Sequence, residues 1–529
     1  MVAKVSEERR IASRAGIVAL GTLVSRLLGL GRDMALAAYF SRAATDAWLI
    51  AFQIPNMLRQ LVAEGAVQTS VLPVLTDVRE KRGELAARAY FRALTGLWLC
   101  VLALLSALGV WAAPLLVDLF ASGFRDRPGQ FELTAELTRW AFPYIFFMGL
   151  SSLGVAALNA SGRFLATSFA PGLLNVAFIA FSFGVPIFLA ARGEPPILAM
   201  ALAALVGGAA QVLAQWPSLR QIGFLTWPSF DCKNPHVGEA MRRLTPSLLG
   251  IGVYYVDVII GRRMLADLGE GAVTYFSYAL RLCDFSQGIF IMALSSATLP
   301  SLASAAAKGR LDEVGRTFAF SLRHALFVGI PSTLLLVTLA QPLVEVLLGH
   351  GSFDGLASVE TSRALVAQGA SVFLVAGVRQ VVLVYFAVGR TRFPVLVAAI
   401  DLLVFWSSSL VLTPQLGHVG VSWGVTIARV GQFALLFFGL RRILPQRHAR
   451  EVLGAGTKVS LAALAAAAAS WLLLGALTSA TRLGWLGEVG RLSAALLGFA
   501  LVFVLAARAL GCSELETVAA PIRRRLRGG

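Results

Sequence analysis

The sequence predicts an all-α polytopic membrane protein with about fourteen transmembrane helices. We expect two parallel six-helix lobes around a central cavity, followed by two C-terminal helices. Hydrophobic residues make up 57% of the chain and charged residues only 14%, and the mean hydropathy is +0.75. Apolar stretches of about 20 residues, enough to span a bilayer as a helix, recur from end to end. Sequence landmarks also repeat at a constant spacing in the two halves.

The apolar runs give the predicted spans in chain order. Their approximate residue numbers are 16–40, 46–77, 92–121, 138–160, 164–190, 196–216, 244–266, 270–302, 320–348, 360–388, 393–413, 419–440, 457–478 and 489–510. The second and eighth runs are long enough to be tilted or to extend past the bilayer. The first run is too long for the apolar core of a signal peptide, so we expect the N-terminus to be retained.

Basic residues collect in alternate loops. These lie at the N-terminus, around residues 79–92, 242–243, 308–323, 390–392 and 441–450, and in the tail that ends with Arg523, Arg524, Arg525 and Arg527. The positive-inside rule therefore places both termini in the cytoplasm. The formal net charge of +17 reflects membrane orientation, and we expect no nucleic-acid partner.

An internal repeat relates the two halves of the chain. Pro73 and Pro300 differ by 227 in residue number, as do Gly162 and Gly389. Pro114 and Pro342 differ by 228. Repeats separated by an even number of spans argue for parallel halves that alternate access to a central path. We predict lobes at residues 1–225 and 226–445, with two extra spans and a basic tail at 446–529.

Three arginines, Arg26, Arg59 and Arg281, fall near the middle of predicted spans. A guanidinium stays charged at physiological pH and costs about 2.5–3.5 kcal/mol at a helix centre. Their positions predict a wet cavity with anionic contents.

Structural ion pairs are the alternative for the charged residues in these spans. The pairs to consider are Arg32 with Asp33 or Asp46, Arg59 with Glu64, and Arg281 with Asp284. No acid lies at helical spacing on the same turn as Arg26, and we assign Arg26, Arg59 and Arg281 to ligand binding and leave the acids to pairing or gating.

Helix-weakening residues accompany the arginines. Gly29 and Gly31 lie between Arg26 and Asp33, and we expect irregular backbone there, of the kind that lines a cavity. Pro55 is expected to kink the second span, with Asn56 and Arg59 on neighbouring turns of one side.

Four segments carry a family resemblance. They read SRLLGLGRD, ATDAWLIAFQIPNMLRQLVAEGA, VLPVL and YALRL. Together they resemble the MurJ (MviN) family, the lipid II flippases of the multidrug/oligosaccharidyl-lipid/polysaccharide exporter superfamily, and the similarity runs from about residue 10 to about 510. It implies transport of an undecaprenyl-pyrophosphate-linked peptidoglycan precursor across the bacterial inner membrane. It also implies that the last two spans form a groove for the lipid tail, in contact with membrane lipids, and that cell-wall synthesis proteins are partners to test.

The resemblance implies specific site residues. The essential cavity arginines of the family fall on Arg26, Arg32, Arg59 and Arg281, and its supporting polar positions fall on Ser25, Asp33, Asp46, Asn56 and Glu64. Leu280 stands where the family commonly has an acid, and Gln53 stands where some members have a lysine. We therefore expect this cavity to be less negative and the ion pairing around Arg281 to differ from that of the family.

A sodium ion is the one cofactor that the resemblance leaves open. Asp257 and Thr426 match two of the sodium ligands used by some family members, while Phe405 and Ser409 stand where other ligands are expected. Asp401, one turn earlier, is the local substitute. The alternative is that Asp257 forms an ion pair with Arg262 or Arg263 on its own helix.

An enzyme is not expected. The sequence has no GxxxxGK[ST] phosphate loop, so the energy for transport would come from the membrane potential or an ion gradient. Two other functions remain open: a polysaccharide-lipid flippase of the same superfamily, and a scaffold for cell-wall synthesis that transports nothing. A drug antiporter for cations would need an acidic cavity, against the excess of arginine.

Overall fold

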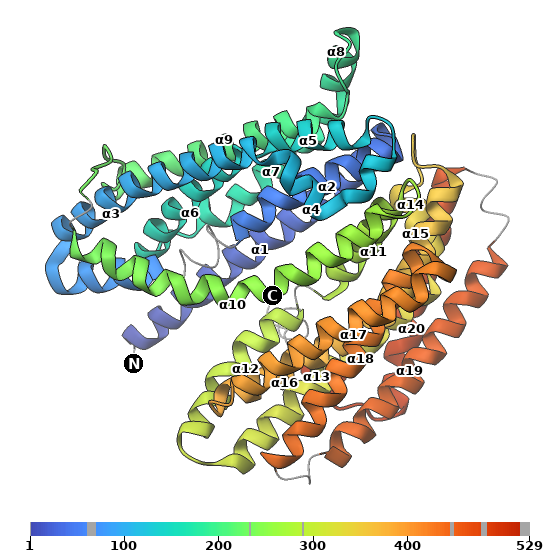
Figure 1. The fold of residues 1–529 in the computed structure, drawn as a ribbon. Coiled ribbons are helices and arrows are strands. Elements are labelled where there is room, and N and C mark those ends of the chain that lie inside the picture. The colour runs from blue at the N-terminus through green and yellow to red at the C-terminus, as the bar shows by residue number, and fades with distance from the viewer. Residues whose placement is uncertain are drawn as a thin grey trace. The chain divides into compact units, whose positions relative to one another are not determined.

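The computed structural model describes residues 2–60, 70–231, 234–287, 290–444, 449–477 and 484–518. Every regular element in these ranges is a helix (Figure 1), which confirms the predicted all-α class. The chain forms two compact units. The first holds Met1–Thr274 with Gly351–Phe353, and the second holds Tyr275–His350 with Asp354–Gly529. The division into lobes at about residues 225 and 445 stays a prediction.

The first unit contains the helices α1 to α10 and the 3-10 helix η3. Their bounds are α1 Val2–Tyr39, α2 Arg42–Arg59, α3 Leu72–Trp111, α4 Ala113–Ala121, η3 Ser122–Asp126, α5 Gln130–Ala141, α6 Tyr144–Ala160, α7 Leu165–Phe183, α8 Val185–Ala191, α9 Leu198–Gln221 and α10 Pro235–Ala266. Helix α11, Ala272–Gln287, begins in this unit and continues into the second.

The second unit contains the remaining helices. Their bounds are α12 Phe290–Ala307, α13 Leu311–Thr338, α14 Ala340–Leu348, α15 Gly355–Gly369, α16 Val372–Ala387, α17 Arg392–Leu416, α18 His418–Gly439, η4 Leu440–Arg442, α19 Ala449–Ala476 and α20 Trp485–Ala509.

The helix boundaries reproduce the sequence repeat. Helices α6 and α16 end 227 residues apart, at Ala160 and Ala387, and α7 and α17 begin 227 residues apart. The glycines that follow α6 and α16, Gly162 and Gly389, have φ angles of +70° and +73°. A left-handed residue just beyond a helix is favourable for glycine because it has no Cβ. The two halves therefore use the same device at the same point of the repeat.

Ten segments of the described chain are long and apolar enough to cross a membrane, and each overlaps a predicted span. They are Leu72–Trp111, Gln130–Ala160, Leu165–Phe183, Leu198–Gln221, Leu311–Thr338, Gly355–Ala387, Arg392–Leu416, His418–Arg442, Glu451–Ala476 and Trp485–Ala509. The first begins 20 residues before the predicted span 92–121 and includes the end of the predicted span 46–77. The other four predicted spans fall on α1, α2, α10 and α11–α12, and they carry the charged candidates that the structure describes, except Asp401 on α17. The approximate count of fourteen thus separates into ten apolar and four charged segments.

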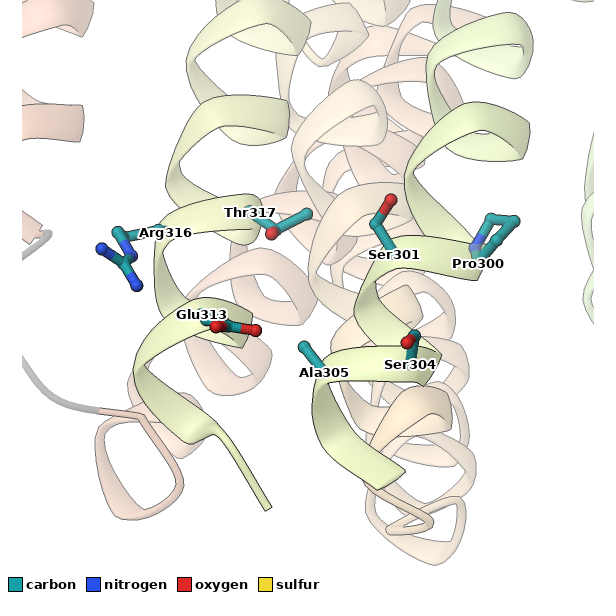
Figure 2. A pocket seen from close by; sticks show the side chains of 7 residues that line it. All are labelled: Pro300, Ser301, Ser304, Ala305, Glu313, Arg316 and Thr317. Carbon is teal, nitrogen blue, oxygen red and sulfur yellow. The ribbon is translucent and has the colours of Figure 1, made fainter. Parts of the chain in front are cut away.

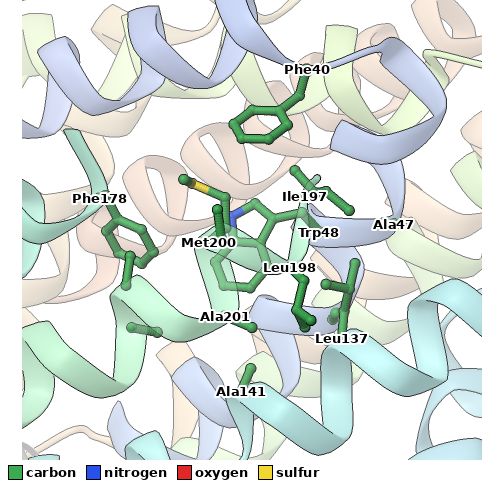
Figure 3. Close-up of a cluster of buried hydrophobic side chains, with 14 of the residues drawn as sticks. Phe40, Ala47, Trp48, Leu137, Ala141, Phe178, Ile197, Leu198, Met200 and Ala201 are labelled. Carbon is green, nitrogen blue, oxygen red and sulfur yellow. The ribbon is translucent and has the colours of Figure 1, made fainter. Parts of the chain in front are cut away.

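Small side chains let the helices of the first unit approach one another closely. Around Trp48 and Phe178, helix α9 contributes Ala201 and other fully buried alanines, and α5 contributes Leu137 and Ala141 (Figure 3). Trp48 also stacks on Phe52, with ring centres 4.9 Å apart. Tight packing of small residues holds helices together where lipid supplies no hydrophobic driving force. This cluster packs α2 against α5, α7 and α9.

Candidate functional site

Arg32 and Asp33 form an ion pair near the end of α1. Arg32 Nη2 lies 2.7 Å from Asp33 Oδ1, and Arg32 Nε donates a hydrogen bond to the same oxygen at 2.9 Å. The guanidinium also lies 5.7 Å from the centre of the Phe178 ring. Of the two acids considered for Arg32, the structure therefore pairs it with Asp33.

A buried amide on α7 joins this pair to an earlier turn of α1. Arg32 Nη1 donates to Asn175 Oδ1 at 3.3 Å, and Asn175 Nδ2 donates to the backbone oxygen of Ser25 at 3.0 Å. Ser25 and Arg32 are seven residues apart, so Asn175 spans two turns on one face of α1. Asn175 is not among the residues predicted from the sequence, although a lone amide in an apolar span is a visible signal.

The expectation of irregular backbone in α1 is wrong. The helix runs without interruption from Val2 to Tyr39, through Gly29 and Gly31. Its glycines instead permit close packing. A Cβ on Gly21 would lie 2.5 Å from the backbone oxygen of Ser168 on α7, and one on Gly31 would lie 3.4 Å from Ile179. The small residues of α1 therefore allow contact with α7.

Arg26 and Arg59 are both half-buried. Arg26 precedes Asp33 by seven residues, so it lies two turns earlier on the same face of α1. On α2, Arg59 Nε donates to Asn56 Oδ1 at 3.0 Å, which orients the guanidinium along its own helix. Glu64, the other candidate partner of Arg59, lies outside the described residues.

Asp46 is fully buried near the start of α2 and has a different set of partners from the one predicted. Its carboxylate accepts hydrogen bonds from the Gly271 amide at 2.7 Å, the Thr274 amide at 2.8 Å and the Thr274 hydroxyl at 2.6 Å. Arg127 Nη1 lies 3.7 Å away. The alternative that paired Asp46 with Arg32 is therefore wrong. Charge-assisted bonds to two amides and a hydroxyl compensate the buried charge and hold the start of α11 against α2.

Arg281 lies on α11, in the part of that helix that belongs to the second unit. Leu280, Arg281 and Asp284 are exposed within the structure, whereas Tyr278 and Cys283 are buried. The helix therefore presents its charged candidates on one side and packs the other. Asp284 follows Arg281 by three residues, the spacing at which helical side chains are neighbours.

Two of the three sodium candidates, Asp401 and Thr426, lie in the second unit and contact other protein groups. Arg429 Nη1 on α18 lies 2.9 Å from Asp401 Oδ2 on α17 and also donates to Gln432. The Thr426 hydroxyl donates to the backbone oxygen of Ala367 at 2.6 Å. Asp257, the third candidate, is half-buried on α10 in the first unit. Over the described ranges, no three His, Cys, Asp or Glu side chains are grouped to hold a metal ion.

A polar cavity of about 600 Å³ lies between α12 and α13 (Figure 2). Its lining consists of Pro300, Ser301, Ser304, Ala305, Glu313, Arg316 and Thr317. Glu313 is paired with Arg310 at 3.1 Å, and Arg316 lies 3.7 Å from Asp312, both within the first turns of α13. The cavity contains none of the candidate arginines, so it is separate from the site that the sequence predicts.

The ten membrane-length segments and the helical repeat define the class of protein, a polytopic helical membrane protein. The fold matches a solved lipid II flippase MurJ in an inward closed conformation, with a TM-score of 0.76 over 93% of this chain and 99% of that one, at 21% identity. It also matches an inward-facing MATE family multidrug transporter of the MOP superfamily, with a TM-score of 0.65 over 79% of this chain and 94% of that one, at 15% identity.

Sequence comparison defines the family. The family model for lipid II flippase MurJ matches residues 36–486. A relative from Burkholderia cenocepacia, described as lipid II flippase MurJ, is 33% identical over 426 residues, which cover 80% of this chain and 82% of the relative. The chain belongs to the MurJ family.

Proposed function

We propose that the chain is a lipid II flippase. It carries the undecaprenyl-pyrophosphate-linked peptidoglycan precursor from the cytoplasmic to the periplasmic leaflet of the bacterial inner membrane by alternating access. The observation that carries this proposal is the family match, which extends over residues 36–486 and so includes most of both halves of the repeat. The protein acts as a transporter and makes or breaks no bond in its substrate.

The arginines would supply the substrate contacts. A pyrophosphate carries two or more negative charges, and a guanidinium matches its oxygens with paired hydrogen bonds. Within residues 16–39, α1 has Arg26 and Arg32 but only one acid, Asp33. We assign Arg26, Arg59 and Arg281 to the pyrophosphate. Three further residues have supporting roles: Arg32 orients the site, and Ser25 and Asn56 contribute polar contacts.

The acids would serve gating and pairing. Asp46 holds Gly271 and Thr274 through hydrogen bonds, and breaking them would free the start of α11, the helix that carries Arg281. Asp33 keeps Arg32 in place, and Asp284 stands one turn from Arg281. Glu64 would pair with Arg59. We also place both termini in the cytoplasm, because the basic loops alternate along the chain.

Complementation of a strain depleted of its own flippase tests the proposal. The wild-type chain is expected to restore growth, whereas Arg26→Ala, Arg59→Ala and Arg281→Ala should fail while reaching normal levels in the membrane. Truncating a buried charge contact costs about 2–5 kcal/mol of binding, which corresponds to a loss of more than tenfold. Lysine at these positions should rescue only in part, because an ammonium lacks the planar fork.

Arg125→Ala, which removes an exposed pair with Asp118, is the matched control. Full growth of all three alanine variants would contradict the assignment.

We further propose that transport needs no sodium ion. Asp401 is paired with Arg429, so the one acid among the second-unit candidates already has a cationic partner, and the guanidinium would repel a second cation beside it. We expect the melting temperature and transport rate of the wild type to be unchanged across a sodium titration at constant ionic strength. A sodium-dependent gain that disappears in Asp257→Asn would establish a sodium site instead.

A further inference from the structure

The loop that connects α9 to α10, Ile222–Asp231, exposes two large aromatic side chains. Trp227 is 87% exposed and Phe230 is 65% exposed. Exposed aromatic groups of this size mark interaction surfaces, and in membrane proteins they concentrate at the boundary between lipid and water. The loop is therefore a candidate contact surface outside the proposed transport site.

The backbone of this loop is held in place on α3. Arg92 Nε donates to the backbone oxygen of Trp227 at 3.0 Å, and the Ser229 amide donates to the backbone oxygen of Arg92, also at 3.0 Å. The loop passes so close to Gly96 that a Cβ there would overlap the Ser229 oxygen. The backbone that carries Trp227 and leads to Phe230 is thus attached to α3.

The attachment point lies at one end of a membrane-length apolar stretch. Arg92 is the last charged residue before residues 93–111, none of which is charged. At 1.5 Å per residue this stretch of helix measures about 28 Å, close to the hydrocarbon thickness of a bilayer. Its other end is Trp111, which is 78% exposed. Arg92 and Trp111 therefore mark the two borders, and the loop lies at the border marked by Arg92.

We propose that the loop Ile222–Asp231 is a membrane-interface anchor whose partner is the phospholipid headgroup layer at this end of α3. The rings of Trp227 and Phe230 insert among the headgroups, where an aromatic side chain has both apolar and polar surroundings. Arg92 and Arg220, both exposed beside the loop, pair with lipid phosphates. The anchor fixes the connector between α9 and α10 to the membrane surface, and it does not depend on which lipid the protein transports.

Tryptophan fluorescence in lipid nanodiscs tests the anchor. The emission of Trp227 is obtained as the difference between the full-length wild type and Trp227→Phe. We expect this emission to be quenched by phosphatidylcholine brominated on the upper acyl chain and to be protected from aqueous iodide. The difference for Trp111→Phe should also respond to brominated lipid, whereas that for Trp98→Phe, whose indole is buried in the same helix, should respond to neither quencher. Quenching of Trp227 by iodide and not by brominated lipid would overturn the proposal.

A change of headgroup tests the role of the arginines. Replacing part of the phosphatidylcholine by phosphatidylglycerol should lower the accessibility of Trp227 to acrylamide, a neutral aqueous quencher, further in the wild type and less in Arg220→Gln. Equal accessibility in both lipids would overturn the phosphate pairing.

Discussion

Helices α7 and α17 occupy equivalent positions in the repeat but handle a buried polar residue differently. They begin 227 residues apart, and each buries one amide or carboxylate side chain near its middle, Asn175 in α7 and Asp401 in α17. Asn175 is a neutral amide bonded to α1 through Arg32 and Ser25. Asp401 is a carboxylate paired with Arg429 on α18.

The contrast between Asn175 and Asp401 shows that the two halves of the chain treat buried charge differently. Asn175 adds no charge beside Arg32 and Asp33, and it only bonds to Arg32 and Ser25 as a neutral amide. Asp401 and Arg429 cancel each other inside the second unit. A buried pair of this kind costs desolvation energy and serves the fold or its specificity more than binding. We therefore expect mutations at the first site to change transport and mutations at the second to change stability.

Breaking the pair in the second unit should have the largest effect on stability. Asp401→Ala removes the carboxylate beside the half-buried Arg429 guanidinium and is expected to lower the free energy of unfolding by about 3 kcal/mol, whereas Asp401→Leu with Arg429→Leu should recover most of the loss. Thermal unfolding in detergent measures both. If the double variant is as unstable as the single one, the pair does more than neutralise charge.

A smaller effect is expected where α1 packs on α7. A Cβ on Gly21 would meet the Ser168 backbone at 2.5 Å, whereas nothing lies within 4 Å of a Cβ on Gly16. Gly21→Ala should therefore cost about 1–3 kcal/mol through overpacking, and Gly16→Ala should gain up to about 1 kcal/mol from helix propensity. The comparison is made by thermal unfolding of the two variants. Equal effects would contradict the close approach of α1 and α7.

The smallest stability change is expected at Asn175. Asn175→Leu removes hydrogen bonds to Arg32 and Ser25, and such bonds between membrane helices contribute about 0.6 kcal/mol each on average, so the expected loss is about 1 kcal/mol. The transport rate should fall clearly even though the loss of stability is small, because Arg32 loses one of the groups that orient it. Both are measured on the same reconstituted protein. A loss of stability with an unchanged transport rate would place Asn175 in the fold alone.

The sequence predicts one part of this molecule well, because the relevant information is local. Apolar runs locate ten membrane-length segments, the constant spacing of landmarks locates the repeat, and adjacency indicates the pairing of Arg32 with Asp33. The partners of Asp46 could not be predicted in this way, since Gly271 and Thr274 lie more than 220 residues away along the chain. The glycines of α1 were misinterpreted for the same reason. Whether a glycine weakens a helix or admits a neighbour depends on what packs against it, here Ser168.

Binding of an undecaprenyl-pyrophosphate lipid to purified variants tests the central claim most directly, because it separates ligand charge from structural charge. Native mass spectrometry or calorimetry would compare the wild type, Arg26→Ala, and the double variant Asp401→Leu with Arg429→Leu. We predict that Arg26→Ala loses at least tenfold in affinity while the double variant binds like the wild type. Equal affinity of Arg26→Ala and the wild type, or a loss confined to the double variant, would contradict the account.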